Sequence, residues 1–80
     1  MPHISPSQVT GLGQTVAANL RAEMARRRIR GRDVAEQLGR GGPWLSRRLT
    51  GEVAFTLDEL EAVAAAIGVR VVDLLDEVAA

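Results

Sequence analysis

The stretch GRDVAEQLGRGGPWLSRRLTG, residues 31–51, decides the fold of this chain. It holds two short segments with apolar residues at helical spacing, separated by a glycine-rich turn. Glycine favours the left-handed conformation that ends a helix, and proline suits the first turn of the next helix because its missing N–H would be unpaired there. Gly39 therefore predicts the end of one helix, Pro43 the start of a second, and Gly51 its end.

The second short helix, expected over residues 43–50, has an apolar and a polar face. At about 100° per residue its two leucines point inward and Arg47 points outward, flanked by Trp44 and Ser46. Two short helices joined by a tight turn form a helix-turn-helix motif, whose second helix enters the major groove of DNA. Because hydroxyl, guanidinium and indole groups suit that groove, we predict base contacts from Trp44, Ser46 and Arg47.

Contacts to the phosphate backbone are expected from residues around this motif, since arginine and threonine side chains commonly hold phosphate oxygens. The predicted residues are Arg28, Arg32, Arg40, Arg48 and Thr50. Two of the predicted site residues have an equally plausible structural role. Trp44 could pack over the first helices, and Arg48, at the edge of the inward face, could simply be solvated.

The flanking segments predict the rest of an all-α, five-helix domain. A first helix is expected from about Gly13 to Arg28. A fourth helix is expected to begin with a capping box at Thr56 and Glu59 and to end at Gly68. The apolar residues Val71, Val72, Leu74, Leu75 and Val78 predict a short fifth helix, which would pack on the domain or on a partner. We expect residues 1–12 to form a flexible arm and residues 13–80 to form the domain.

The charges are distributed unevenly along the chain, although the formal net charge is zero. Residues 1–51 hold nine arginines and three carboxylates, a net charge of +6, and residues 52–80 hold one arginine and seven carboxylates, a net charge of −6. All ten basic residues are arginine, which favours forked contacts to phosphate and guanine but is equally typical of a GC-rich genome.

Several classes of protein are disfavoured by the composition. With 80 residues and no cysteine, the chain suits one core without disulfides or thiolate metal sites, in a reducing cytoplasm. No apolar run approaches the roughly 20 residues that span a bilayer. The single histidine, His3, lies in the arm, and tyrosine is absent, so we expect neither an enzyme nor a cofactor or metal site.

The segment from Val16 to Leu75 resembles the lambda-repressor and Cro-like (XRE-type) helix-turn-helix family. The matching landmarks, in order and without gaps, are Val34-Ala35, Leu38-Gly39, Leu45-Ser46-Arg47, Gly51, Leu60, Ala64 and Ile67-Gly68-Val69. The resemblance implies five helices, binding to DNA as a dimer, and a repressor or related regulator of phage or bacterial origin. The arginine- and alanine-rich style resembles actinobacterial or actinophage members.

The chain departs from this family at three places. Many members carry glutamine at the position of Gly31 and a polar base-contacting residue at that of Gly42, which implies that specificity moves to the predicted base contacts here. Some members pair an arginine with a glutamate at the positions of Met24 and Leu49, and an apolar contact would replace that ion pair.

The leading hypothesis is therefore a sequence-specific transcriptional regulator that acts as a homodimer on a palindromic operator. An antitoxin that binds both its operator and a toxin is the nearest alternative, and sequence does not separate the two. A protein-interaction module that uses the apolar C-terminal helix remains a further alternative.

Overall fold

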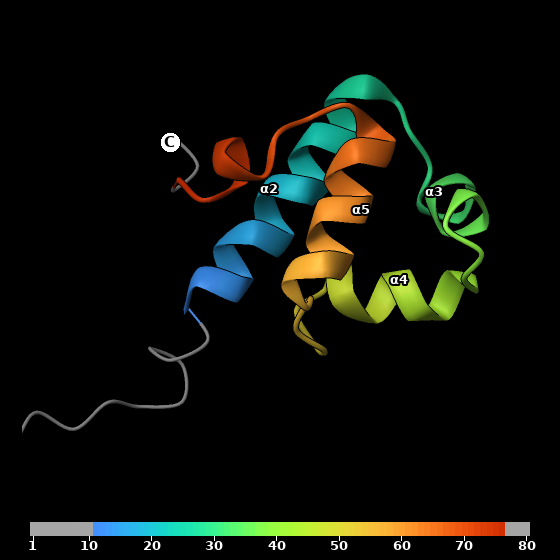
Figure 1. The fold of residues 1–80 in the computed structure, drawn as a ribbon, viewed down its shortest axis with the longest axis horizontal. Helices are drawn as coiled ribbons and strands as arrows, with labels where there is room; N and C mark the ends of the chain where they lie inside the picture. The colour runs from blue at the N-terminus through green and yellow to red at the C-terminus, as the bar shows by residue number, and fades with distance from the viewer. Residues whose placement is uncertain (1–10, 77–80) are drawn as a thin grey trace, which may run out of the picture.

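The computed structural model describes residues 11–76 as an all-helical domain (Figure 1). Four α-helices are present in this range, followed by one short 3-10 helix. Their bounds are α2 Gly11–Arg27, α3 Gly31–Gln37, α4 Gly42–Leu49, α5 Leu57–Ile67 and η1 Val71–Leu74. The expected bounds of the first four helices agree with these to within about two residues, and α2 begins earlier, at Gly11.

The core is built from one apolar stripe on each helix. Its fully buried members include Leu20 of α2, Val34 of α3, Leu45 of α4 and Val63 of α5. Each is at most 2% exposed, so every helix loses the freedom to rotate about its axis. The outward face of each helix is therefore fixed by the leucine or valine beneath it.

The helix ends follow the local chemistry predicted from the sequence. Pro43 lies in the first turn of α4, and Gly39 and Gly51 follow α3 and α4 with φ values of 70° and 84°. At the start of α5, the Thr56 hydroxyl accepts from the Glu59 N–H at 3.1 Å while the Glu59 carboxylate accepts from the Thr56 N–H at 2.9 Å. The predicted capping box is thus confirmed.

The expected fifth α-helix is wrong within the described residues. The segment Val71–Leu74 forms a single 3-10 turn, and Val78 lies outside the described range. Only Leu74 of this segment is fully buried. The buried Asn19 side chain of α2 explains the departure, because its Nδ2 donates to the carbonyls of Leu74 at 2.7 Å and Asp76 at 2.6 Å. Bonds to α2 thus replace those that a longer helix would make.

The helix-turn-helix pair lies on one side of the domain. Figure 1 shows α3 and α4 beside each other, with α4 along the edge of the molecule where α5 begins. None of the helices in residues 11–76 is both long and apolar enough to cross a membrane. The residues predicted to contact bases all belong to α4.

Candidate nucleic-acid interface

The outer face of α4 carries two of the predicted base-contacting residues. Ser46 and Arg47 are both exposed, whereas Leu45 between α4 and the core is 1% exposed. Neither the Ser46 hydroxyl nor the Arg47 guanidinium has a hydrogen-bond partner among residues 11–76. Both side chains are thus available to an external ligand.

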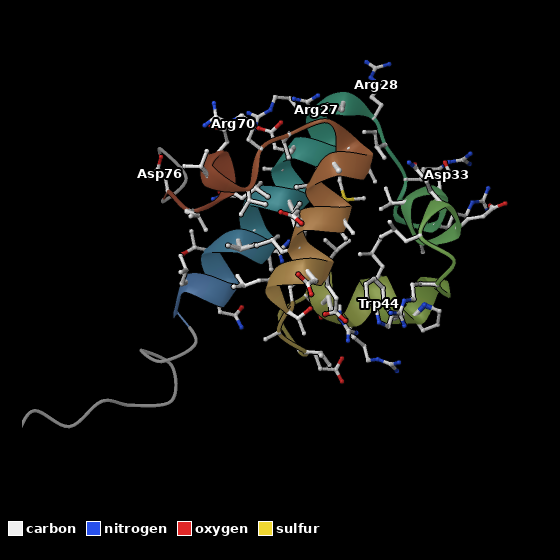
Figure 2. All side chains as sticks on the ribbon, viewed as in Figure 1. Arg27, Arg28, Asp33, Trp44, Arg70 and Asp76 are labelled. Atoms are coloured by element: carbon white, nitrogen blue, oxygen red, sulfur yellow. The ribbon has the colours of Figure 1, made fainter. Side chains whose placement is uncertain are left out.

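Trp44 lies differently, on the side of α4 that faces the start of α5. Its indole is half-buried, and the guanidinium carbons of Arg48 and Arg40 lie over the ring at 4.3 Å and 4.9 Å from its centroid. Cations at this distance are attracted to the face of an aromatic ring. Figure 2 labels Trp44 on α4. This placement supports the packing interpretation of Trp44, and its predicted base contact stays untested.

Arg48 is held by Glu59, eleven residues further along the chain. Its Nε donates to Oε1 of Glu59 at 3.1 Å and its Nη2 to Oε2 at 3.4 Å, while Nη1 donates to the Trp44 carbonyl at 3.2 Å. The side chains of Arg48 and Glu59 are only 15% and 19% exposed. This ion pair ties α4 to α5, so little of the Arg48 guanidinium remains for a phosphate.

The same carboxylate belongs to the capping box of α5, and both roles favour its charged form. The Thr56 N–H, with the larger effect, and the Arg48 guanidinium lower the pKa of Glu59 below its usual value. At neutral pH Glu59 therefore carries its full negative charge, which balances the positive charge of Arg48. The net positive charge of this face comes from other arginines.

A hollow of about 440 Å³ lies between α4 and the junction of α2 with α3. It is lined by Gly31, Gly42, Leu45 and Leu49 and by the polar or charged residues Arg21, Arg32, Ser46 and Thr50. Arg32 and Thr50, two of the predicted phosphate contacts, are exposed beside the Ser46 hydroxyl. The Thr50 hydroxyl also donates to the Arg47 carbonyl at 3.0 Å. The structure thus gathers these predicted residues around one feature.

Arg28, also a predicted phosphate contact, lies away from this hollow. Figure 2 shows it projecting from the turn after α2, on the side of the molecule opposite α4, where Arg27 also lies. Its φ of 57° places it in the left-handed region, where it ends α2. The distance from α4 gives no support to its predicted phosphate contact, which stays untested.

Other arginines of residues 1–51 form ion pairs with carboxylates three or four positions away. Glu23 binds Arg26 at 2.6 Å and Arg27 at 3.1 Å, and Asp33 binds Arg30 at 3.0 Å. The Arg27 side chain, followed by that of Arg26, lowers the pKa of Glu23. Among the described residues the arginines without an ion pair near α4 are Arg21, Arg32, Arg40 and Arg47. Four arginines without an ion pair within residues 11–76 therefore lie around α4.

Sequence reasoning missed two α2 residues that hold the end of α4. The Arg21 guanidinium donates to the Leu49 carbonyl, and Gln14 Nε2 donates to the Gly51 carbonyl at 3.2 Å. The two donors lie seven residues apart, on one face of α2. Because both partners are backbone carbonyls distant in sequence, no spacing pattern could have revealed them.

Met24 and Leu49 lie where the resemblance implied an apolar contact. Atoms of both side chains, and of Leu45, are 3.8–3.9 Å from the position of a Cβ built on Gly31. The three side chains thus form one apolar layer under the start of α3. No ion pair links α2 to α4 at this point within residues 11–76.

The groups exposed on and around α4 are of kinds that contact DNA. Exposed guanidinium and hydroxyl groups on one short helix, with further arginines around it, are groups that contact base edges and phosphates. Residues 11–76 contain no group of three or more acidic, histidine or cysteine side chains that could hold a metal ion.

Comparison with known families gives an independent result. A family model described as a helix-turn-helix domain matches residues 15–78, which is most of the chain. No curated protein and no solved structure matches the chain. The matched region contains the whole of α3 and α4 and the core that supports them. The chain therefore belongs to the helix-turn-helix domain family, whose members are DNA-binding and typically non-enzymatic.

Proposed function

We propose that the protein is a sequence-specific transcriptional regulator that places α4 in the major groove of double-stranded DNA. The observation that carries the proposal is the exposure of Ser46 and Arg47 on α4, above the buried Leu45. A guanidinium can bond O6 and N7 of guanine together, and a hydroxyl bonds several base edges. Arg47 therefore contacts a guanine and Ser46 an adjacent base.

Phosphate contacts accompany these base contacts. Arg32 and Thr50 are exposed at the edge of the hollow next to Ser46, and Arg40 is exposed beside Trp44. These positions flank α4 on two sides, as the phosphates of the two strands flank a major groove. Arg48 is engaged by Glu59, so the proposal assigns it and Trp44 to holding α4 in place.

The test begins with selection of bound sequences from a random duplex pool. On the selected site, Arg47→Ala should cost about 1–3 kcal/mol and relax the preference at one base pair, whereas Arg32→Ala should weaken all sequences alike. Each variant should also lower the salt dependence of binding, because one fewer counterion is released.

Arg70→Ala is the matched control for lost charge. Arg70 is exposed on the opposite side of the molecule from α4 and has no ion pair within residues 11–76. Arg70→Ala should bind the selected and the scrambled duplexes almost as the unsubstituted protein does. Equal losses on selected and scrambled DNA for Arg47→Ala would remove Arg47 from base recognition.

A homodimer on a palindromic operator is the second part of the proposal. An apolar patch, formed by Leu12, Phe55, Leu57 and Leu75, surrounds a shallow groove of about 180 Å³. Leu57 is 82% exposed and Leu12 is 57% exposed, which is unusual for leucine and typical of a surface that binds protein. Two copies of this chain joined through the patch would place two α4 helices on half-sites about 34 Å apart.

Sedimentation and DNA binding test the dimer. Leu57→Glu should give a monomer that binds a palindrome no better than a single half-site, while Ala65→Glu, at another exposed position of α5, should leave both properties unchanged. Two half-sites bound by an unsubstituted monomer would contradict this part of the proposal.

Within this function we favour a repressor or Cro-like role of the kind found in phages and bacteria. The same apolar patch also supports an antitoxin, in which it would hold a toxin protein while α4 binds the operator. Purification from the native host separates the two. A stoichiometric second polypeptide that Leu57→Glu releases would favour the antitoxin, and a homodimer without it would favour the repressor.

A further inference from the structure

The hollow beside α4 is opened by two glycines whose backbone conformations do not require glycine. Gly31 and Gly42 are the first residues of α3 and α4, and neither has the positive φ found at Gly39, Gly51 and Gly68. A Cβ on Gly42 would meet nothing within 4 Å, and one on Gly31 would make only ordinary contacts. A Cβ would fit at both positions, so the glycines leave space that the backbone does not require.

The base of this space is apolar. The side chains nearest to Gly31 are those of Leu45, Leu49 and Met24, each about 3.8–3.9 Å from its Cβ position. Leu49 is only half-buried, although it belongs to the layer that packs on the core. An apolar side chain partly open to water is stabilised when a ligand covers it with apolar atoms.

The edge of the same space is polar and positively charged. Arg21 and Arg32 lie on one side of it and Ser46 on the other, next to Arg47. The Arg21 guanidinium donates to a backbone carbonyl, and neither Arg21 nor Arg32 has an ion pair within residues 11–76. The charge complements a phosphate backbone, so the ligand should combine a polyanion with a small apolar group.

We infer that this hollow accepts the C5-methyl group of a thymine in the bound DNA, with the edge of that base. The inference rests on the proposed function and adds a specificity determinant to it. The thymine methyl is the one apolar group that a base pair presents in the major groove, and apolar contact with it distinguishes thymine from cytosine. A hollow of about 440 Å³ is large enough to admit the methyl together with the base edge.

The inference predicts which chemical change in DNA the protein detects. Replacing one thymine by deoxyuridine removes only the methyl group. Burying a group of this size contributes about 0.8 kcal/mol, which corresponds to about a fourfold change in affinity for each half-site. At that position, 5-methylcytosine should recover part of the affinity lost on changing thymine to cytosine.

The test uses the full chain and its selected duplex, with each thymine replaced in turn by deoxyuridine. One thymine per half-site should show about a fourfold loss of affinity. Gly42→Leu, which fills the hollow, should bind the thymine and deoxyuridine duplexes equally. Thermal unfolding confirms that Gly42→Leu remains folded, and the unbranched Gly42→Met serves if it does not.

Gly41→Ala is the matched control. Gly41 directly precedes Gly42 but does not line the hollow, and a Cβ there would contact only Cδ of Pro43 at 3.7 Å. This variant should keep the full preference for thymine over deoxyuridine.

Each other outcome is decisive. A duplex panel in which no deoxyuridine changes affinity overturns the inference and leaves the proposed function standing, as would a selected site without thymine near α4. Sensitivity to the methyl that persists in Gly42→Leu shows that another residue contacts it, which also overturns the inference. Failure to bind any duplex overturns the proposed function itself.

Discussion

Gly51 ends α4 in a left-handed conformation, and replacing it by alanine tests how firmly the end of that helix is held. Its φ is 84°, and a Cβ built on it would collide with the side-chain amide of Gln14. The same amide donates to the Gly51 carbonyl at 3.2 Å. Alanine at this position must therefore adopt an unfavourable conformation and also displace Gln14.

The two effects have separate magnitudes. The left-handed conformation costs an alanine about 1–2 kcal/mol, and loss of one hydrogen bond costs about 0.5–1.5 kcal/mol. Their sum is about 1.5–3.5 kcal/mol. For a domain of this size each kcal/mol lowers Tm by about 4–8 °C, so Gly51→Ala should melt about 6–28 °C below the unsubstituted protein.

Two other glycines separate these effects in the same assay, thermal unfolding followed by far-ultraviolet circular dichroism. Gly39 has φ 70° with nothing within 4 Å of its Cβ position, so Gly39→Ala should show only the conformational cost. Gly13 lies inside α2 with open space around it, so Gly13→Ala should raise the free energy of unfolding of the domain by about 0.5–1 kcal/mol.

The Gln14 contribution is isolated in a Gln14→Ala background. There the difference between Gly51→Ala and Gly39→Ala should disappear, because the displaced side chain is absent. Our account of the end of α4 is refuted if Gly51→Ala melts no lower than Gly39→Ala, or if the difference survives removal of the Gln14 side chain.

Three further substitutions test the core, the C-terminal turn and the link between α4 and α5. Leu45→Ala should destabilise the domain by about 2–5 kcal/mol in urea unfolding, because this side chain is 1% exposed under α4; a loss below 1 kcal/mol would contradict the packing. Asn19→Ala should cost about 1–3 kcal/mol, since it removes the donor to the Leu74 and Asp76 carbonyls, and hydrogen exchange should rise selectively in η1. The pKa of Glu59 is lowered on folding, so its contribution to stability is present above its unfolded pKa of about 4.3 and is lost as pH falls through the folded value. The free energy of unfolding, measured in urea, should therefore fall below about pH 4.3, and it should fall less steeply in Glu59→Gln. An equal dependence on pH in both proteins would count against this role of Glu59.

The helix boundaries could be predicted because their causes are local. Pro43 is placed by its own ring, Gly39 and Gly51 by their tolerance of positive φ, and Thr56 by a hydrogen bond to a residue three positions away. Each cause lies within one helical turn of the boundary that it sets. The inward direction of Leu45 follows in the same way from helical periodicity.

The features that the sequence did not predict have a different cause, which is contact between segments far apart in the chain. The fifth helix was expected from apolar residues alone, but Asn19, more than fifty positions earlier, bonds the carbonyls that a helix would use. The packing of Trp44 against Arg48, which is held by Glu59, likewise depends on where α5 begins, while the predicted base contact of Trp44 stays untested. Periodicity describes one helix and carries no information on such partners.

These long-range contacts bear on function because they hold α4 from both sides. The Arg21 and Gln14 side chains bind carbonyls at its C-terminal end, and Arg48 joins it to Glu59 at the start of α5. None of these contacts uses Ser46 or Arg47, which stay exposed. A helix fixed in this way loses little further freedom when it binds, so more of the contact energy appears as affinity. Substitutions at Gln14 or Glu59 should therefore lower DNA affinity without changing which bases are preferred, whereas those at Arg47 should change the preference itself.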